Sequence, residues 1–169
     1  MWYVIQVRTG TEESIRIQCE KQIPASVLEK CCLPYYERMR RYEGAWHKEQ
    51  KLLFPGYLFL ISDQLEGLYL NLKSVIGLTK LIGTGREIVP LTKEETELIL
   101  RLAGEDELVE MSRGVIQEGK TVITDGPLKG LEGYIRKVDR HKRVAWLEIQ
   151  MMGRTVETQV GVEVLRKEM

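Results

Sequence analysis

Two clusters of basic side chains are the residues of this sequence best suited to chemistry with another molecule. The first cluster lies within residues 36–51, interleaved with aromatic residues, and comprises Arg38, Arg40, Arg41, Lys48 and Lys51. The second lies within residues 136–143 and comprises Arg136, Lys137, Arg140, His141, Lys142 and Arg143. Arg and Lys at a protruding turn are suited to phosphate contacts, and a turn can enter an RNA groove or bulge. Both clusters are therefore candidate RNA-binding sites, with a solvated charged surface as the alternative.

Residues that could support catalysis or bind a metal do not occur at the spacings that these functions need. Cys19, Cys31 and Cys32 lack the C-x-x-C spacing of a zinc site, and adjacent cysteines form a disulfide only with strain. The sequence contains no phosphate-binding P-loop, no G-x-S-x-G and no H-E-x-x-H motif. We therefore expect free thiols, no metal, no cofactor and no enzymatic activity.

The composition indicates a globular protein without a global attraction to nucleic acid. The chain has 169 residues, of which 43% are hydrophobic, enough for one domain or two small ones. Its 25 basic residues balance 25 acidic ones, so any contact with RNA or DNA must come from a local patch. Met1 is followed directly by the strand-like sequence WYVIQVR, which does not resemble a signal peptide, and no apolar run is long enough to span a bilayer. We expect a cytoplasmic protein.

The first basic cluster is expected on a long β-hairpin within an α+β fold. Aromatic and β-branched runs alternate with segments of helical periodicity, and Thr92 with Glu95 forms a capping box. The predicted strands are residues 2–8, 31–42, 46–54, 57–61 and 75–82, and the predicted helices are residues 11–23, 65–72 and 92–101. This alternation predicts a sheet with helices packed against it.

The second basic cluster is expected at a turn of a small barrel. Residues 103–118 are polar and acidic, which predicts a flexible linker between domains spanning residues 1–102 and 119–169. Beyond the linker, short β-rich runs are separated by turn residues, as in a small barrel. These runs are residues 121–124, 133–138, 144–150, 155–160 and 162–165.

The sequence resembles the NusG family of transcription elongation factors over nearly its whole length. Residues 120–167, with the motif DGPLKGLEG at 125–133, resemble a KOW domain, a small all-β barrel of the SH3-like type. Residues 2–4 (WYV), 54–59 (FPGYLF) and 75–83 (VIGLTKLIG) resemble the amino-terminal NGN domain, an α+β domain whose antiparallel sheet is flanked by helices. The last of these elements has Ile76 where the family usually has proline.

The resemblance implies a protein that binds RNA polymerase. In the family, a hydrophobic pocket of the amino-terminal domain docks on the clamp helices of the β′ subunit, and the domain reaches toward the β subunit. Carried over by motif, the pocket candidates here are Tyr3, Phe54, Tyr57 and Phe59. Alternation along a strand puts Tyr57 and Phe59 on one face, so packing in the core would also account for them.

Within the family, the sequence is more similar to the specialised antiterminators of the LoaP type than to the housekeeping factor. The segment CLPYY at 32–36 and the basic tip of the hairpin differ from the housekeeping factor and resemble specialised paralogues such as LoaP or RfaH. LoaP is the closer likeness, because the β-branched residues and turn glycines of the second module favour a permanent barrel over one that can convert to helices. This likeness implies a monomer that promotes processive antitermination of selected operons and binds a hairpin in the nascent leader RNA. Two alternatives stay open: a housekeeping factor whose KOW domain recruits Rho or a ribosomal protein, and a plain RNA-binding module that shares only the barrel.

Overall fold

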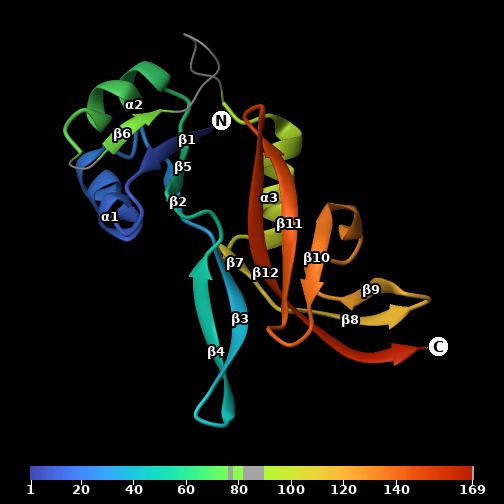
Figure 1. Cartoon of the computed structure of the whole chain (residues 1–169). Coiled ribbons are helices and arrows are strands. Elements are labelled where there is room, and N and C mark those ends of the chain that lie inside the picture. The colour runs from blue at the N-terminus through green and yellow to red at the C-terminus, as the bar shows by residue number, and fades with distance from the viewer. Residues whose placement is uncertain (76–77, 82–89, 169) are drawn as a thin grey trace. The chain divides into compact units, whose positions relative to one another are not determined.

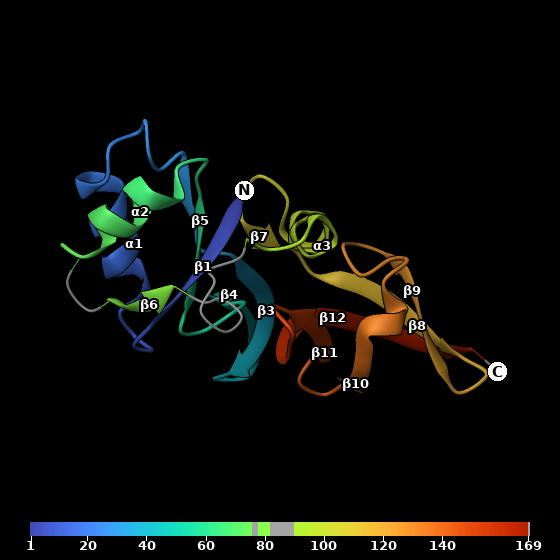
Figure 2. The ribbon, with the colours of Figure 1, turned by 90° about the horizontal axis from the view of Figure 1, so that it is seen from above.

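The computed structural model describes residues 1–75, 78–81 and 90–168 (Figures 1 and 2). The described chain forms two compact units that alternate along the sequence. The first unit comprises Met1–Leu33, Phe54–Thr96 and Met151–Gly153, and the second comprises Pro34–Leu53, Glu97–Gln150 and Arg154–Met169. No helix in the described ranges combines the length and hydropathy needed to cross a membrane.

The first unit is built on a four-stranded antiparallel sheet. Its strands are β2 (Lys30–Cys32), β5 (Tyr57–Ile61), β1 (Trp2–Val7) and β6 (Leu78–Leu81), in that spatial order. The helices α1 (Glu12–Gln22) and α2 (Leu65–Leu72) lie on the same side of this sheet (Figures 1 and 2). Ile15 and Cys19 of α1, with Leu68 and Leu72 of α2, are buried, as expected for the apolar stripes of amphipathic helices.

A buried carboxylate ties the start of α1 to the loop before β5. Glu12 is 2% exposed, and its two oxygens accept hydrogen bonds from the backbone N–H groups of Gly10, at 2.7 Å, and Gly56, at 2.8 Å. Thr11 is the N-cap residue of α1, but its hydroxyl makes no capping bond and donates to the carbonyl of Arg8. The Glu12 carboxylate instead fixes the two loops that meet at the start of α1, through charge-assisted bonds that are stronger than those of a neutral acceptor.

The second unit contains the long hairpin that the sequence predicted. Strands β3 (Tyr35–Tyr42) and β4 (Ala45–Leu52) pair along their whole length, and Figure 1 shows them as a two-stranded ribbon. Glu43 and Gly44 both have positive φ, at 52° and 77°, which is the geometry of a type I′ hairpin turn. A short strand, β7 (Leu108–Val109), adds to β3 in parallel.

Helix α3 (Lys93–Ala103) begins at the capping box expected from the sequence. The backbone N–H of Thr92 donates to Glu95 at 2.9 Å, and the N–H of Glu95 donates to the Thr92 hydroxyl at 3.2 Å. These reciprocal bonds satisfy donors that the first helical turn would otherwise leave unpaired.

The rest of the second unit is a curled five-stranded sheet that fits the barrel predicted for a KOW domain. Its spatial order is β10-β11-β12-β8-β9. The elements are β8 (Ser112–Gln117), β9 (Lys120–Asp125), a short 3₁₀ turn (Glu132–Tyr134), β10 (Ile135–Asp139), β11 (Val144–Met151) and β12 (Arg154–Glu168). Ile123, Leu128, Leu147 and Val160 are buried in it.

Residues 103–118 contain regular structure where the sequence indicated a flexible linker. This stretch includes β7 and β8, and β8 pairs with β9 on one side and in parallel with β12 on the other. The sequence of β8 is mostly polar and does not by itself indicate a strand, because the parallel partner that stabilises it, β12, lies far along the chain. The predicted division at residues 102 and 119 into independent domains stays a prediction.

Two other expected boundaries differ in the structure. The predicted strand 31–42 is divided into β2 and β3 by Leu33 and Pro34. The predicted break near residue 161 is absent, because β12 runs through it without interruption. A Cβ at Gly161 would lie 2.2 Å from the carbonyl oxygen of Glu37, so this glycine serves a close approach of β12 to β3 instead of a turn. The motif at 75–83 lies partly outside the described residues.

Candidate functional site

The hairpin β3–β4 carries the first basic cluster, and acidic side chains hold part of it in place. Arg38 lies 3.5 Å from Glu49, Arg40 lies 4.0 Å from the same carboxylate, and Lys48 lies 3.7 Å from Glu37. The Arg38 side chain is 16% exposed, whereas that of Arg40 is 62% exposed. Arg38 is therefore mainly part of the hairpin's own ion pairs. Four residues of the cluster present charge to solvent: Arg40, Arg41, Lys48 and Lys51.

Aromatic contacts stiffen the tip of this hairpin. The rings of Tyr42 and His47 stack with centroids 3.7 Å apart and an interplanar angle of 17°. The guanidinium of Arg40 lies 5.9 Å from the Tyr42 centroid, within the range of a cation–π contact. Nearer the base, burial raises the pKa of Tyr36, and its hydroxyl donates to Gln159 of β12 at 3.4 Å. The basic side chains thus project from a hairpin whose backbone and aromatic side chains are held by these contacts.

The turn between β10 and β11 carries the second basic cluster and is fixed by Asp139. One carboxylate oxygen of Asp139 accepts hydrogen bonds from the backbone N–H groups of His141 and Lys142, each at 3.0 Å. The bond from Lys142 is the main cause of a pKa of Asp139 below its ordinary value. The side chains of Arg140, His141 and Lys142 are exposed. This turn therefore presents cations outward while its one acid is engaged with the backbone.

The remaining members of the second cluster are engaged in contacts within the protein. Arg136 pairs with Glu148 at 3.1 Å and donates to the carbonyl of Gly133 at 2.8 Å. The ammonium of Lys137 lies 5.1 Å from the centroid of Trp146. The guanidinium of Arg143 lies 3.9 Å from the centroid of Trp46, and its Nη1 lies 3.6 Å from Glu163.

The structure brings both basic clusters to the wall of one cavity in the second unit. The cavity has a volume of about 330 Å³. Its lining residues are Arg38, Met39, Arg40, Arg41, Trp46, His141, Lys142, Val144, Trp146 and Gln159. Sequence reasoning missed Trp146 and Gln159 as members of this site. Their sequence neighbourhood shows only the alternating pattern of a β-strand, in β11 and β12. This pattern does not indicate that the β3–β4 hairpin lies next to them.

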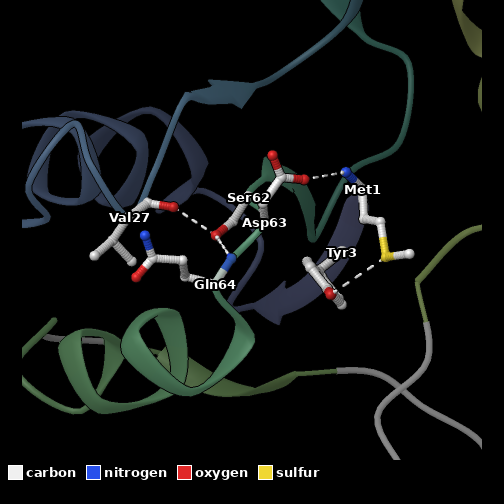
Figure 3. Close-up of polar contacts among 6 residues, drawn as sticks. All are labelled: Met1, Tyr3, Val27, Ser62, Asp63 and Gln64. Carbon is white, nitrogen blue, oxygen red and sulfur yellow. Dashed lines mark hydrogen bonds and ion pairs between the residues drawn. The ribbon is translucent and has the colours of Figure 1, made fainter.

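The four candidates for polymerase binding do not share one face of the sheet in the first unit. The β1–β5 register pairs Val4 with Phe59 and Tyr3 with Leu60, so Tyr3 and Phe59 point to opposite faces. Figure 3 shows Tyr3 near the amino terminus, where its hydroxyl lies 3.8 Å from the sulfur of Met1. The same close-up shows the Met1 amino group 3.4 Å from Asp63 and the Ser62 hydroxyl bonded to the Val27 carbonyl. Tyr3 is 5% exposed and packs on the face opposite Phe59.

Phe54, Tyr57 and Phe59 gather with one aromatic residue that the sequence did not single out. The rings of Phe54 and Phe59 meet edge to face with centroids 5.5 Å apart, and the Trp2 ring lies 6.1 Å from that of Phe59. Phe54 and Phe59 are 2% and 0% exposed, whereas Tyr57 and Trp2 are half-buried. Tyr57 and Trp2 are therefore the accessible members of this aromatic group.

The cysteines of the first unit pack as free thiols. Cys31 and Cys19 share a hydrogen bond that raises the pKa of Cys31 and lowers the pKa of Cys19. Burial raises the pKa of Cys31 further. Among the residues with described positions, no group of three or more His, Cys, Asp and Glu is arranged to hold a metal ion.

An α+β unit with an antiparallel sheet, together with a curled β sheet bearing a basic turn, fits the architecture that the sequence predicted for a transcription elongation factor. The family model described as "Transcription termination factor nusG" matches residues 1–100. The chain therefore belongs to the NusG family, whose members are non-enzymatic transcription factors that bind RNA polymerase.

Relatives and a solved structure resemble the chain along nearly its whole length. The transcription termination/antitermination protein NusG of Halalkalibacterium halodurans is 25% identical over 169 residues, covering 96% of this chain and 94% of the relative. The protein of the same name from Thermus thermophilus is 28% identical over 176 residues, covering 96% and 94%. A solved structure that describes domain interaction in Thermotoga maritima NusG has a TM-score of 0.63 at 27% identity and covers 96% of this chain and 93% of that one.

Proposed function

We propose that this NusG-family protein is a specialised antitermination factor that binds RNA polymerase and, through its basic surface, a hairpin in the nascent leader RNA. The observation that carries the proposal is the meeting of the two basic clusters at one cavity. Cations from the β3–β4 hairpin and from the β10–β11 turn then act as one electropositive surface. A surface that gathers several phosphates gains affinity with each one it neutralises.

The polymerase contact is assigned to the aromatic group of the first unit. Tyr57 and Trp2 are accessible, the Trp2 ring lies against Phe59, and Tyr57 shares the strand face of Phe59. Tyrosine and tryptophan suit a protein interface because each combines a large apolar area with a polar atom that can bond at the rim. The partners are the clamp helices of the β′ subunit and, across the cleft, the β subunit. Tyr3, the fourth candidate, lies on the opposite face of the sheet and is 5% exposed, so we assign it a packing role in this proposal.

The mechanism requires no bond to be made or broken. A protein that binds the elongating conformation of polymerase more tightly than the paused one shifts the population toward elongation. Binding of the leader RNA would raise the local concentration of the protein at polymerases that transcribe selected operons. The protein acts as a monomer in the cytoplasm, with the segments 1–102 and 119–169 as its two functional domains.

A housekeeping role is the second candidate. It is favoured by the names of the relatives, which are termination/antitermination proteins in organisms as distant as Halalkalibacterium and Thermus. In that case the curled sheet would recruit Rho or a ribosomal protein, and the basic surface would be a solvated face. Leader-independent action on all transcripts would distinguish this role.

Terminator readthrough by the cognate polymerase tests the proposal. The templates carry or lack the leader of the protein's own operon, and readthrough is compared with and without the protein. We expect readthrough to require the leader and to fall when Arg140 and Lys142 are both changed to Glu. The matched control is Lys120→Glu, an exposed lysine on β9 that does not line the cavity. Readthrough that ignores the leader and the charge reversal would favour the housekeeping role.

A further inference from the structure

The cavity between the basic clusters has the size of a site for one nucleotide. Its volume of about 330 Å³ lies at the lower end of the range for small-molecule sites, roughly 300–1,000 Å³. A base pair inside a duplex cannot enter the cavity, because its bases are stacked on their neighbours. The deep, narrow major groove of an A-form helix also keeps side chains away from the base edges. The volume therefore fits a single unstacked base.

The apolar part of the wall contains two indoles. Trp46 comes from β4 and Trp146 from β11, and Met39 and Val144 complete this part of the lining. Arg143 covers one face of the Trp46 ring at 3.9 Å, and Lys137 lies 5.1 Å from the Trp146 centroid. These cations hold the indoles in fixed positions before any ligand arrives. Fixed aromatic rings are the usual platforms on which proteins stack single bases.

The charged part of the wall is positive only. None of the ten lining residues is acidic, and they include three arginines and one lysine. Arg38 and Arg40 lie near Glu49, whereas Arg41 and Lys142 have no acidic side chain within ion-pair distance in the described parts of the chain. Arg41 comes from the β3–β4 hairpin and Lys142 from the β10–β11 turn, and two such cations suit the phosphates that flank a base. The acids nearby are already engaged: Glu49 lies near Arg38 and Arg40, and Asp139 accepts backbone hydrogen bonds in the turn. Arg41 and Lys142 are thus left to attract an anionic ligand.

One polar side chain in the wall can bond to the edge of a base. Gln159 is half-buried on β12, and its amide oxygen already accepts a hydrogen bond from Tyr36 at 3.4 Å. This bond orients the amide so that its NH₂ group stays available as a donor. An acceptor atom on the base edge would pair with it.

We propose that this cavity captures one unpaired nucleotide of an RNA hairpin, with its base against an indole of the wall and its phosphates at Arg41 and Lys142. The inference rests on the proposed leader-RNA function and names the feature recognised: a bulged or looped-out base instead of a uniform duplex. The duplex arms on either side would contact the exposed cations of the hairpin and the turn.

The test compares three RNA hairpins of equal stem length that are fully paired, or carry one bulged adenosine or one bulged uridine. Affinities of the full chain are measured by fluorescence anisotropy. We expect at least one bulged hairpin to bind about fivefold or more tightly than the paired one, the lower end of what stacking of one base contributes. Trp146→Leu should remove this preference, and Lys120→Gln should leave it in place. Equal affinity for all three hairpins would overturn the proposal.

Nuclear magnetic resonance gives a readout that does not depend on a variant that folds. The chain has three tryptophans, and each indole N–H gives one signal. Bulged RNA should shift the signals of Trp46 and Trp146 and leave that of Trp2, which lies in the other unit, in place. Shifts of the same size with the paired hairpin, or with a polyglutamate peptide, would contradict the assignment of an unpaired base.

The two proposals fail in different ways. If the leader is required for readthrough but bulged and paired hairpins bind alike, the cavity inference fails and the antitermination proposal stands. If bulged RNA shifts the two indole signals but readthrough ignores the leader, the cavity is an RNA site and the antitermination proposal fails.

Discussion

The guanidinium of Arg143 lies 3.9 Å from the centroid of the Trp46 ring, which joins the β10–β11 turn to the β3–β4 hairpin. Arg143 has a positive φ of 57°, its backbone carbonyl accepts a hydrogen bond from Val162, and its side chain pairs with Glu163. An arginine with these contacts is a structural part of the basic surface. It positions Trp46, whereas its neighbours in the turn are free to meet phosphate.

The contact between Arg143 and Trp46 should appear as a coupling energy. In a double-mutant cycle of Arg143→Ala and Trp46→Leu, we expect about 0.5–2 kcal/mol of coupling in the free energy of unfolding. Urea denaturation of the four proteins measures it. Arg140→Ala, in the same turn but exposed, is the control and should change the stability by less than about 0.5 kcal/mol. Additive effects in the cycle would show that the contact contributes nothing.

The exposed turn cations should determine the salt dependence of RNA binding. Arg140→Gln and Lys142→Gln should each reduce the slope of log K against log salt concentration by about 1, because each removes one phosphate contact. Arg136→Gln should reduce it less, since Arg136 is engaged with Glu148 at 3.1 Å. Titrations at several salt concentrations measure the slopes, with Lys120→Gln as control. Equal slopes in all variants would remove the turn from the interface.

The aromatic group of the first unit should separate into binding and supporting residues. Tyr57→Ala should weaken polymerase binding at least about tenfold, as hot-spot tyrosines do, and lower the stability by only about 1 kcal/mol. Phe59→Ala should lower the stability by about 3–5 kcal/mol, because a large side chain that is 0% exposed leaves a cavity. Pull-down with polymerase and thermal unfolding measure the two effects. Unchanged polymerase binding by Tyr57→Ala would move the interface elsewhere.

The buried carboxylate of Glu12 should be important for the stability of the first unit. Glu12→Gln keeps the size of the side chain but replaces one acceptor oxygen with a donor that faces a backbone N–H. We expect a loss of about 1–3 kcal/mol in the free energy of unfolding. Glu20→Gln on the same helix is the control, because its exposed pair with Arg16 contributes less than about 1 kcal/mol. Equal stabilities of the two variants would contradict this account of the α1 start.

The β10–β11 turn should loosen in acid. The pKa of Asp139 is below its ordinary value of 3.8 because its ionised form accepts the backbone bonds, so its contribution to stability is present above that pH. The contribution is lost as the pH falls through the lower pKa of the folded state. The amide signals of His141 and Lys142, followed by nuclear magnetic resonance, should therefore titrate below pH 3.8. A midpoint at or above that value would show that these bonds do not favour the ionised form.

Local patterns were sufficient to predict many elements of the fold. The capping box of Thr92 and Glu95 marks the start of α3, and the Glu43-Gly44 turn marks the hairpin. The predicted strand 57–61 and helix 65–72 agree with β5 and α2. These features depend on residues a few positions apart, whose backbone preferences and hydrogen bonds form within the segment itself.

Local sequence patterns did not predict which distant segments pair with one another. Strand β8 lies in the stretch predicted as a linker. It was not recognised as a strand, because it is stabilised by backbone bonds to β9 and β12 and has no apolar alternation of its own. Gly161 was expected near a break, yet it lies inside β12 where the chain passes closely over Glu37. A glycine has the same local signature in a turn and at a close approach of two backbones.

The sequence by itself determined the residue types of the candidate sites: basic side chains at two turns and aromatic side chains around β5. The tertiary structure decided which of them act together. Strand register placed Tyr3 on the face opposite Phe59, and the packing of β12 against β3 put Trp46, Trp146 and Gln159 around one cavity. The physical reason is that charge and propensity are properties of a residue, whereas a binding site is a set of distances that only long-range packing fixes.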